Sequence, residues 1–193
     1  MKLVFATNNA NKLSEIISLL PAGIEVLSLK DINCIEELPE TNPTLEANAL
    51  QKAKYIFDNY GFNCFADDTG LEIDALGGEP GVYSARYAGR ECREEENIRK
   101  VLHKLEKEKE RSARFRTIIS LILDGKETVF EGICRGRISK KRSGVKGFGY
   151  DPIFIPDGYE LTFAEMSKEE KGAISHRGKA VKELVSLLRL AKS

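Results

Sequence analysis

Apolar and polar positions alternate in blocks along the first thirty residues. Residues 2–6 form a short apolar run that ends in polar Thr7-Asn8-Asn9, which indicates a buried strand. Apolar residues then recur three and four positions apart over residues 13–20, as on one face of a helix, and Pro21 ends this pattern. Residues 24–29 form a second apolar run. A strand, a helix and a strand in this order predict a parallel pair of strands.

The next segment predicts a second helix and two short strands. Asn42-Pro43 is typical of a helix start with proline at the first helical position, and Gly61 is the expected left-handed stop. Residues 62–66 are apolar and predict a strand that ends at Asp67-Asp68-Thr69-Gly70. Residues 71–75 alternate between apolar and charged, which predicts a separate, half-exposed strand.

The carboxyl-terminal half predicts a hairpin and a final helix. The segments at residues 115–123 and 127–139 flank Asp124-Gly125, a dipeptide typical of a type I′ turn, and together predict a hairpin. Ser167 to Glu170 has the spacing of a capping box, and residues 181–188 have helical apolar spacing. The pattern as a whole predicts an α/β fold, and we expect residues 1–193 to form a single domain.

Composition narrows the class of protein. Thirty Lys and Arg balance thirty Asp and Glu among 193 residues, with 41% hydrophobic and 31% charged residues. These values fit a soluble globular chain and exclude a collagen, a largely disordered chain and a disulfide-dense mini-protein. The absence of net positive charge argues against a protein held to nucleic acid by bulk charge. The sequence contains no run of about 18 apolar residues, so we expect no membrane-spanning helix.

Cysteine usage and the amino terminus predict a location. The four cysteines include no Cys-x-x-Cys pair and only two histidines accompany them, so a zinc site is not expected. The first apolar run is shorter than the ~7–15 residues of a secretory signal. Free thiols without such a signal predict a reducing, cytoplasmic location.

Several polar or charged segments in the amino-terminal half carry candidate chemistry. Residues 7–12 lie between a strand and a helix, where unpaired N–H groups and Lys12 suit phosphate, although the glycines of a Walker A loop are missing. Asp67 and Asp68, with Glu40 from another loop, are hard oxygen ligands of the kind that Mg²⁺ takes with substrate phosphate. Lys52 lies on the flank of the second predicted helix. Taken alone, these segments also fit a polar turn, a local acceptor and a surface lysine.

The remaining candidates lie near the carboxyl terminus. Gly147-Phe148-Gly149-Tyr150-Asp151 allows an aromatic ring to lie over a flat ligand while the backbone comes close. Lys171 could reach phosphate, and His176-Arg177 could donate hydrogen bonds to a base carbonyl. The alternatives are an aromatic-anchored turn and a pair that only starts the final helix. A basic run over residues 135–146 fits either an RNA patch or an ordinary hairpin surface.

These segments together predict a nucleoside triphosphate site without a P-loop, and they resemble one family over nearly the whole chain. The chain is similar to the inosine triphosphate pyrophosphatase family. The matching segments, in chain order, are Thr7-Asn8-Asn9-Ala10-Asn11-Lys12, Phe65-Ala66-Asp67-Asp68-Thr69-Gly70-Leu71, the stretch from Pro80 to Gly89, Gly147-Phe148-Gly149-Tyr150-Asp151-Pro152-Ile153-Phe154, Glu170-Lys171 and Ser175-His176-Arg177-Gly178.

The resemblance implies a fold and an activity. The fold is a two-lobed α/β structure around a long mixed β-sheet flanked by helices, with an active-site cleft between the lobes, usually in a homodimer. The implied activity is Mg²⁺-dependent hydrolysis of ITP, dITP and XTP to the monophosphate and pyrophosphate, which keeps these bases out of DNA and RNA. The implied partner is the purine nucleoside triphosphate, with no nucleic acid and no membrane.

The resemblance also implies residue roles. Asp68 is the proton acceptor and a metal ligand, Glu40 is a metal ligand, and Lys52 and Asp67 match charged catalytic positions. The residues implied to hold the triphosphate are Thr7, Asn8, Asn9, Ala10, Asn11, Lys12, Thr69 and Lys171. The residues implied to hold the base are Phe148, Gly149, Tyr150, Asp151, His176 and Arg177. Donors on His176 and Arg177 aimed at O6 would favour inosine and xanthine over adenine, which carries an amino group there.

The sequence departs from the family pattern at three positions near Glu40, and two other functions are compatible with parts of it. Asn42, Leu45 and Ala47 stand where the family favours Gly, Phe and Glu, which bears on the geometry around Glu40. One alternative is a related pyrophosphatase for nucleotides with altered pyrimidines. Another is a nucleotide-binding or RNA-contacting protein without catalysis, which would have no use for carboxylates near phosphate.

Overall fold

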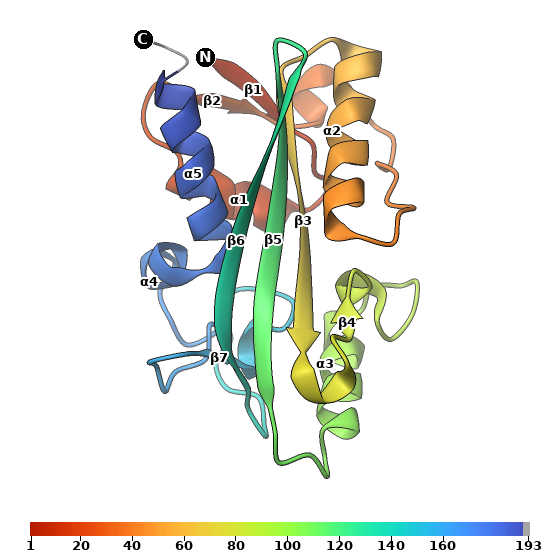
Figure 1. Cartoon of the computed structure of the whole chain (residues 1–193), viewed down its shortest axis with the longest axis vertical. Helices are drawn as coiled ribbons and strands as arrows, with labels where there is room; N and C mark the ends of the chain where they lie inside the picture. Colours follow the sequence, from red (N-terminus) through yellow and green to blue (C-terminus); the bar gives the residue numbers. More distant parts are fainter. Residues whose placement is uncertain (191–193) are drawn as a thin grey trace. The chain divides into compact units, whose positions relative to one another are not determined.

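In the computed structural model, which describes residues 1–190, seven strands form one mixed sheet in the order β2-β1-β3-β5-β6-β7, with β4 beside β3 (Figure 1). The strands are β1 Lys2–Phe5, β2 Glu25–Leu27, β3 Cys64–Ile73, β4 Pro80–Gly81, β5 Ser112–Leu123, β6 Lys126–Ile138 and β7 Phe154–Pro156. β1 pairs in parallel with β2 and β3, whereas β4 and β7 are antiparallel to their neighbours. The prediction of an α/β fold with a mixed sheet is confirmed.

The helices lie between these strands in the chain and after them. The α-helices are α1 Ala10–Leu19, α2 Leu45–Tyr60, α3 Glu94–Lys104, α4 Lys168–Ile174 and α5 His176–Leu190. Four short 3-10 helices cover Lys30–Ile32, Asp74–Leu76, Ser84–Arg86 and Asp151–Ile153 of the described chain. The predicted strand–helix–strand unit at the start of the chain is confirmed, as is the parallel pairing of its two strands.

The chain divides into two compact units. Unit 1 contains residues 1–68, 117–132 and those from 177 onward, and unit 2 contains residues 69–116 and 133–176. Each unit therefore collects segments that are far apart in the sequence.

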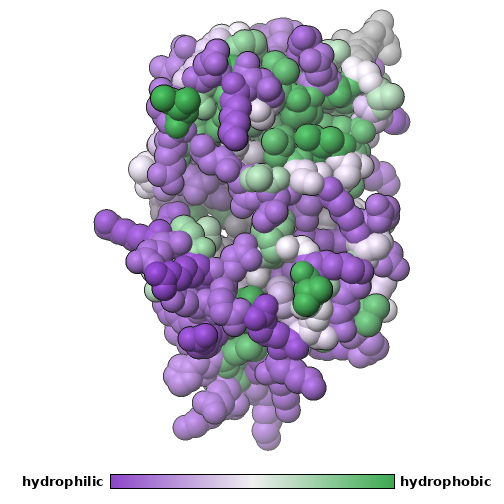
Figure 2. Space-filling view, turned by 180° about the vertical axis from the view of Figure 1, so that it is seen from behind, coloured by the Kyte–Doolittle hydropathy of each residue, from purple (hydrophilic) through white to green (hydrophobic). Residues whose placement is uncertain are grey.

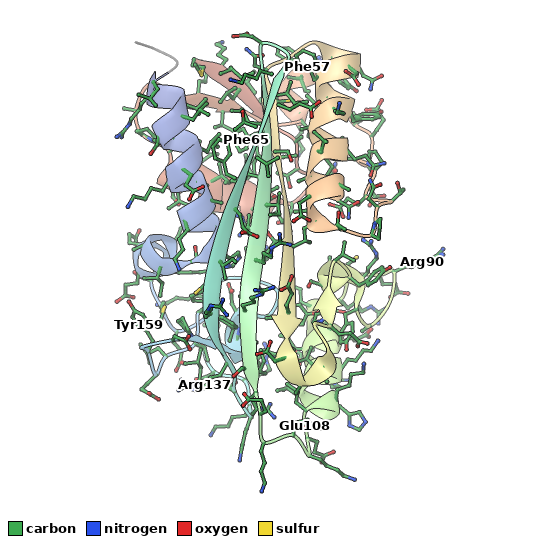
Figure 3. All side chains as sticks on the ribbon, viewed as in Figure 1. Phe57, Phe65, Arg90, Glu108, Arg137 and Tyr159 are labelled. Atoms are coloured by element: carbon green, nitrogen blue, oxygen red, sulfur yellow. The ribbon has the colours of Figure 1, made fainter. Side chains whose placement is uncertain are left out.

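The sheet of unit 1 has an apolar core on each face. Leu3, Phe5 and Phe65 pack with residues of α1 and α5, whereas Val4 and Ala66 pack with residues of α2. Alternate residues of a strand point to opposite faces, so α1 and α5 cover one face and α2 covers the other. Figure 3 shows Phe65 on the α5 side of β3, with its ring stacked on that of Phe5 at 4.7 Å between centroids.

Strand β3 corrects the sequence-based prediction in this region. The chain does not turn at Asp67-Asp68-Thr69-Gly70, and one strand runs without a break from Cys64 to Ile73 and is buried over most of its length. Gly70 permits the pairing with β4, because a Cβ atom there would lie 2.7 Å from the carbonyl oxygen of Gly81. The two aspartates are consecutive residues inside a strand, and they therefore point to opposite faces.

Helix α2 begins two residues later than Asn42-Pro43 predicted. Thr44 is the N-cap, and its hydroxyl oxygen accepts a hydrogen bond from the backbone N–H of Ala47 at 3.2 Å. A threonine oxygen at this position satisfies one of the first N–H groups of the helix. The predicted stop at Gly61 is confirmed, with φ of +69°.

Unit 2 is built around aromatic side chains. Phe115 of β5 packs against Phe154 of β7 with an edge-to-face geometry and a centroid distance of 4.7 Å, and Phe163 lies in the same core. The α3 residues Ile98 and Val101 complete this core. The capping box from Ser167 to Glu170 is confirmed at the start of α4.

The β5–β6 hairpin turns at Asp124-Gly125, and both residues have positive φ, +50° and +78°. This matches the prediction of a type I′ turn, which requires positive φ at both central positions.

The surface is largely polar. Figure 2 shows one face, on which hydrophilic residues predominate and hydrophobic residues gather mainly in its upper half. Arg135 and Arg137 of the basic run are exposed on β6, and Arg137 pairs with Glu160. Within residues 1–190, no helix is long and apolar enough to cross a membrane.

Candidate active site

Asp67 lies at the centre of a buried ion-pair network in unit 1. Its side chain is fully buried, and Oδ1 accepts a hydrogen bond from Nζ of Lys12 at 3.0 Å. Oδ2 accepts hydrogen bonds from Nε and Nη2 of Arg177 at 3.2 and 3.0 Å, and Nη1 of Arg177 pairs with Glu15 of α1. Asp67 therefore joins β3 to the first turn of α1 and the start of α5.

Asp68 faces the other side of the strand, toward α2. Its Oδ2 accepts a hydrogen bond from Nδ2 of Asn48 at 3.2 Å, and its Oδ1 lies 4.0 Å from Nζ of Lys52. The same Nζ donates to the backbone oxygen of Asp67 at 2.7 Å and pairs with Glu40. Lys52 is 4% exposed, so it is a buried lysine and not the surface residue that was the alternative interpretation.

The two neighbouring carboxyls have opposite pKa shifts. Burial raises the pKa of Asp68, and this effect outweighs the attraction of Lys52 and Lys12. Burial also acts on Asp67, but the charges of Lys12, Arg177 and Lys52 outweigh it and hold the pKa of Asp67 well below its usual range. Asp67 is therefore a permanent anion, whereas Asp68 is the better proton acceptor of the pair. Such divergence is typical of an acid–base site.

Burial and the nearby carboxylates also shift the pKa values of Lys12 and Lys52. Burial lowers the pKa of Lys12 despite the attraction of Asp67. For Lys52, burial acts in the same direction, but Asp68 and Glu40 outweigh it and raise its pKa. Lys52 therefore remains a cation at neutral pH.

The loop before α1 is organised by its own side chains. Asn9 caps the helix, and its Oδ1 accepts hydrogen bonds from the backbone N–H groups of Asn11 and Lys12 at 2.9 and 3.1 Å. Thr7 accepts a bond from the N–H of Asn9 through its hydroxyl oxygen at 3.2 Å. Asn8 bonds instead to the segment that leads to Glu40, because its Oδ1 accepts from the N–H of Leu38 at 3.2 Å. The phosphate-binding role of residues 7–12, including Ala10, remains a prediction.

The carboxylates of Glu40 and Asp68 suit Mg²⁺ chemically. Both are hard oxygen donors that share one ammonium group, that of Lys52. Mg²⁺ usually takes one or two carboxylates and completes its shell with water and substrate phosphate. No group of three His, Cys, Asp or Glu side chains in the described part of the chain could hold a metal by itself, so substrate would have to supply ligands.

In unit 2, Asp151 organises the turn that carries Phe148. Asp151 Oδ2 accepts hydrogen bonds from the backbone N–H of Phe148 at 3.0 Å and from Nζ of Lys171 at 2.6 Å. The Lys171 ammonium lies 5.0 Å from the centroid of the Phe148 ring. Gly147 has φ of +73°, and a Cβ atom there would collide with Asp151. The predicted base-binding residues Phe148 and Asp151 are thus brought together, and Lys171, predicted to reach phosphate, lies with them.

The other predicted site residues of unit 2 differ from one another in burial and contacts. Tyr150 is buried, and its hydroxyl donates to the backbone oxygen of Ser84 at 2.8 Å. The His176 ring is 3% exposed and stacks on Phe115 at 4.6 Å between centroids. Thr69 is partly buried in β3, and Gly149 has φ of +61° in the Phe148 turn. A role of these residues in base or phosphate binding remains a prediction.

A family model described as the Ham1 family matches residues 3–187. The chain belongs to the Ham1 family. A dITP/XTP pyrophosphatase of Flavobacterium johnsoniae is 56% identical over 192 residues and covers 100% of both chains. A dITP/XTP pyrophosphatase of Bacillus subtilis is 44% identical in an alignment of 189 residues that covers 96% of each chain.

Solved structures confirm the fold of the Ham1 family in this chain. The Ham1 protein of Staphylococcus aureus aligns with a TM-score of 0.89 and 38% identity, covering 99% of this chain and 100% of the other. A nucleoside-triphosphatase, also called dITP/XTP pyrophosphatase, from Mycobacterium abscessus aligns with a TM-score of 0.77 and 42% identity over 96% of this chain and 99% of the other. The resemblance to the inosine triphosphate pyrophosphatases is confirmed at the level of family and fold.

The departures from the family pattern are accommodated locally. Asn42 does not have the positive φ that would require Gly, and its Nδ2 donates to Oε1 of Gln51 at 2.8 Å. Leu45 is buried at the first turn of α2, and Ala47 donates its N–H to the Thr44 cap. These contacts hold the segment after Glu40 against α2 without the usual Gly, Phe and Glu.

The sequence-based interpretation missed two residues of the candidate site, and it predicted different contacts for Arg177. Asn48 contacts Asp68, and Glu15 contacts Arg177. The only signal for Asn48 was its position four residues before Lys52 on the same helix face. Arg177 is 1% exposed and its guanidinium bonds to two carboxylates, so its contacts point to holding Asp67. Its reading of a base stays a prediction.

Proposed function

We propose that this chain hydrolyses non-standard purine nucleoside triphosphates, such as ITP, dITP and XTP, to the monophosphate and pyrophosphate. Relatives called dITP/XTP pyrophosphatase match it over almost their full length. The observation that carries the proposal is the pair of consecutive carboxyls with opposite pKa shifts beside the partly buried Lys12 and the buried Lys52. One carboxyl can accept a proton while the lysines and Arg177 keep the other ionised.

The reaction follows from these roles. A water molecule attacks the α-phosphorus, and Asp68 accepts its proton, because Asp67 is held as an anion by its bonds to Lys12 and Arg177. Lys12 and Lys52 offset negative charge on the phosphates as the bond to pyrophosphate breaks. Asp67 keeps Lys12 and Arg177 in place and takes no proton. Pyrophosphate leaves in the same step, so no covalent intermediate on the protein is needed.

Glu40 and Asp68 are the residues that would hold Mg²⁺ in this reaction. Bound Mg²⁺ would supply a Lewis acid for the phosphate oxygens. Release of pyrophosphate from ITP should therefore stop when a chelator is added in excess, because two carboxylates alone hold Mg²⁺ weakly. Activity should return when Mg²⁺ exceeds the chelator. Full turnover by metal-stripped protein in chelator would contradict the assignment.

The experiment that tests the function is a substrate panel. Purified protein is incubated with ITP, XTP, GTP and ATP, and pyrophosphate and the nucleoside monophosphate are measured. We expect equal amounts of the two products from ITP and XTP, at rates well above those for ATP and GTP. Release of inorganic phosphate in place of pyrophosphate would contradict the proposal, and a preference for modified pyrimidine triphosphates would favour the related pyrophosphatases.

Phe148 is expected to bind the base without selecting it. An aromatic ring stacks on every base, and such a contact is worth roughly 1–3 kcal/mol. Phe148→Ala should therefore raise KM for ITP and for ATP by similar factors, about 5- to 150-fold. The control is Tyr159→Ala, which removes an exposed aromatic ring of unit 2. A change in the ITP to ATP ratio of kcat/KM would show that Phe148 also discriminates.

The location and assembly of the chain complete the proposal. The chain is proposed to act in the cytoplasm as a homodimer. Sedimentation of the purified protein over a range of concentrations measures the second point directly. The RNA-contacting alternative gains no support from the basic run, since Arg137 and Arg142 are both engaged with glutamates.

A further inference from the structure

Asn48 joins two parts of the candidate site through one buried amide. Its side chain is 1% exposed, and Oδ1 accepts a hydrogen bond from the backbone N–H of Asn42 at 2.8 Å. Its Nδ2 donates to Oδ2 of Asp68 at 3.2 Å. The backbone donor fixes the orientation of the amide, because a flip would place an NH₂ group against the N–H of Asn42 and an oxygen against a carboxylate. The NH₂ group is therefore the one that faces Asp68.

The bond from Asn48 distinguishes the two oxygens of Asp68. Oδ2 accepts the amide bond, whereas Oδ1 lies 4.0 Å from the ammonium of Lys52. The terminal torsion of an aspartate is soft, so the carboxylate turns easily unless a neighbour holds it. Asn48 lies within α2, whose inner face is anchored by Ala49 and Ala53, both 0% exposed. The donor is thus rigid enough to hold the carboxylate in one orientation.

The second hydrogen bond of Asn48 also holds the backbone of the segment that contains Glu40 and Asn42. Asn42 follows Glu40 by two residues, and its backbone is held by the same amide that holds Asp68. A rotation or loss of the Asn48 side chain would therefore release both parts together.

We propose that Asn48 is a positioning residue for the hydrolysis assigned to this cluster, an inference that rests on the proposed function. It acts through Asp68, by fixing the direction in which the carboxylate receives the proton of the attacking water. Groups that orient a metal-ligating carboxylate commonly change metal affinity or activity by about 10- to 100-fold when removed. Asn48 should accordingly affect turnover much more than substrate binding.

Gln51 provides a matched control one turn further along the same helix. Its Oε1 accepts hydrogen bonds from the N–H of Thr41 at 3.1 Å and from Nδ2 of Asn42 at 2.8 Å. Gln51→Ala and Asn48→Ala both loosen the same segment from α2, but only Asn48→Ala removes the bond to Asp68. The difference between the two variants isolates that bond.

The kinetic test compares these variants with ITP as substrate. Asn48→Ala should lower kcat by about 10- to 100-fold and change KM by less than about threefold. Asn48→Asp keeps the acceptor for Asn42 but loses the donor, and it should lose at least as much kcat. Gln51→Ala should keep kcat within about threefold of the wild type. Wild-type kcat in Asn48→Ala, or an equal loss in Gln51→Ala, would overturn the proposal.

A double-mutant cycle tests the same contact without measuring activity. The urea midpoint of unfolding is measured for Asn48→Ala, Asp68→Ala and the double variant. The shift caused by Asn48→Ala should be smaller when Asp68 is already Ala, because the shared hydrogen bond is then absent. Equal shifts in both backgrounds would refute the coupling. If the wild type releases no pyrophosphate, the proposed function fails, and the cycle alone then decides whether Asn48 holds Asp68.

Discussion

Replacing Asp68 by Asn is expected to lower kcat for ITP by about 10²- to 10⁴-fold, the range that a positioned general base contributes. The amide has nearly the same shape but cannot accept the proton of the attacking water. Asp68 is the stronger base of the two neighbouring carboxyls, because burial raises its pKa. Pyrophosphate release measured under saturating ITP checks the prediction.

The fold should survive this substitution. A neutral side chain at a buried position with a raised pKa removes a charge that burial disfavours. Circular dichroism and the melting temperature should therefore stay close to those of the wild type. Asp58→Asn, at an exposed position on α2, is the control and should leave both turnover and stability unchanged. Turnover by Asp68→Asn within a few-fold of the wild type would remove Asp68 from its proposed role.

Replacing Asp67 by Asn is expected to act on stability. The substitution leaves the buried Arg177 and the partly buried Lys12 without the carboxylate that bonds to both. Loss of one partner from a buried ion pair typically lowers the free energy of unfolding by about 3–5 kcal/mol. Urea unfolding at neutral pH measures this change. A loss below about 1 kcal/mol would show that the network contributes little.

The effect should also depend on pH. The pKa of Asp67 in the folded chain lies below its ordinary value of 3.8, so the unfolded chain binds the proton more readily. The stabilisation is therefore complete well above pH 3.8 and is lost as the pH falls below that value. The difference between the wild type and Asp67→Asn should shrink in this acidic range, which unfolding curves between pH 3 and 7 would show. A constant difference would contradict the linkage.

Local signals in the sequence predicted much of the fold. The strand–helix–strand start, the turn at Asp124-Gly125 and the capping box from Ser167 to Glu170 depend on residues within a few positions of one another. Such local rules need no knowledge of the rest of the chain. The family motifs likewise identified most residues around Asp67 and Asp68.

The long strand β3 could not be predicted in this way. Asp67-Asp68-Thr69-Gly70 has the composition of a turn, and strands rarely bury two consecutive carboxyls. Their partners, Lys12 and Arg177 on one face and Lys52 on the other, are up to 110 residues away. Only the assembled unit shows that these charges compensate one another. Asn48 was overlooked for the same reason, since a single asparagine on a helix usually faces water.

Because side chains alternate along β3, the adjacent residues Asp67 and Asp68 have different neighbours and different proposed roles. Asp67 holds an ion-pair network, and Asp68 is the proposed proton acceptor. Asp67 bonds to Arg177 and Lys12 on the face of α1 and α5, whereas Asp68 faces Asn48 and Lys52 of α2. The arrangement also makes the spacing before the pair intolerant of change. Deleting one residue of β3 ahead of Asp67 would move the former Asp68 to the place beside Lys12 and Arg177 and the former Asp67 to the place of Ala66. Thr69 would then stand in the place of Asp68, and the carboxyl that faces Asn48 and Lys52 would be lost from that place.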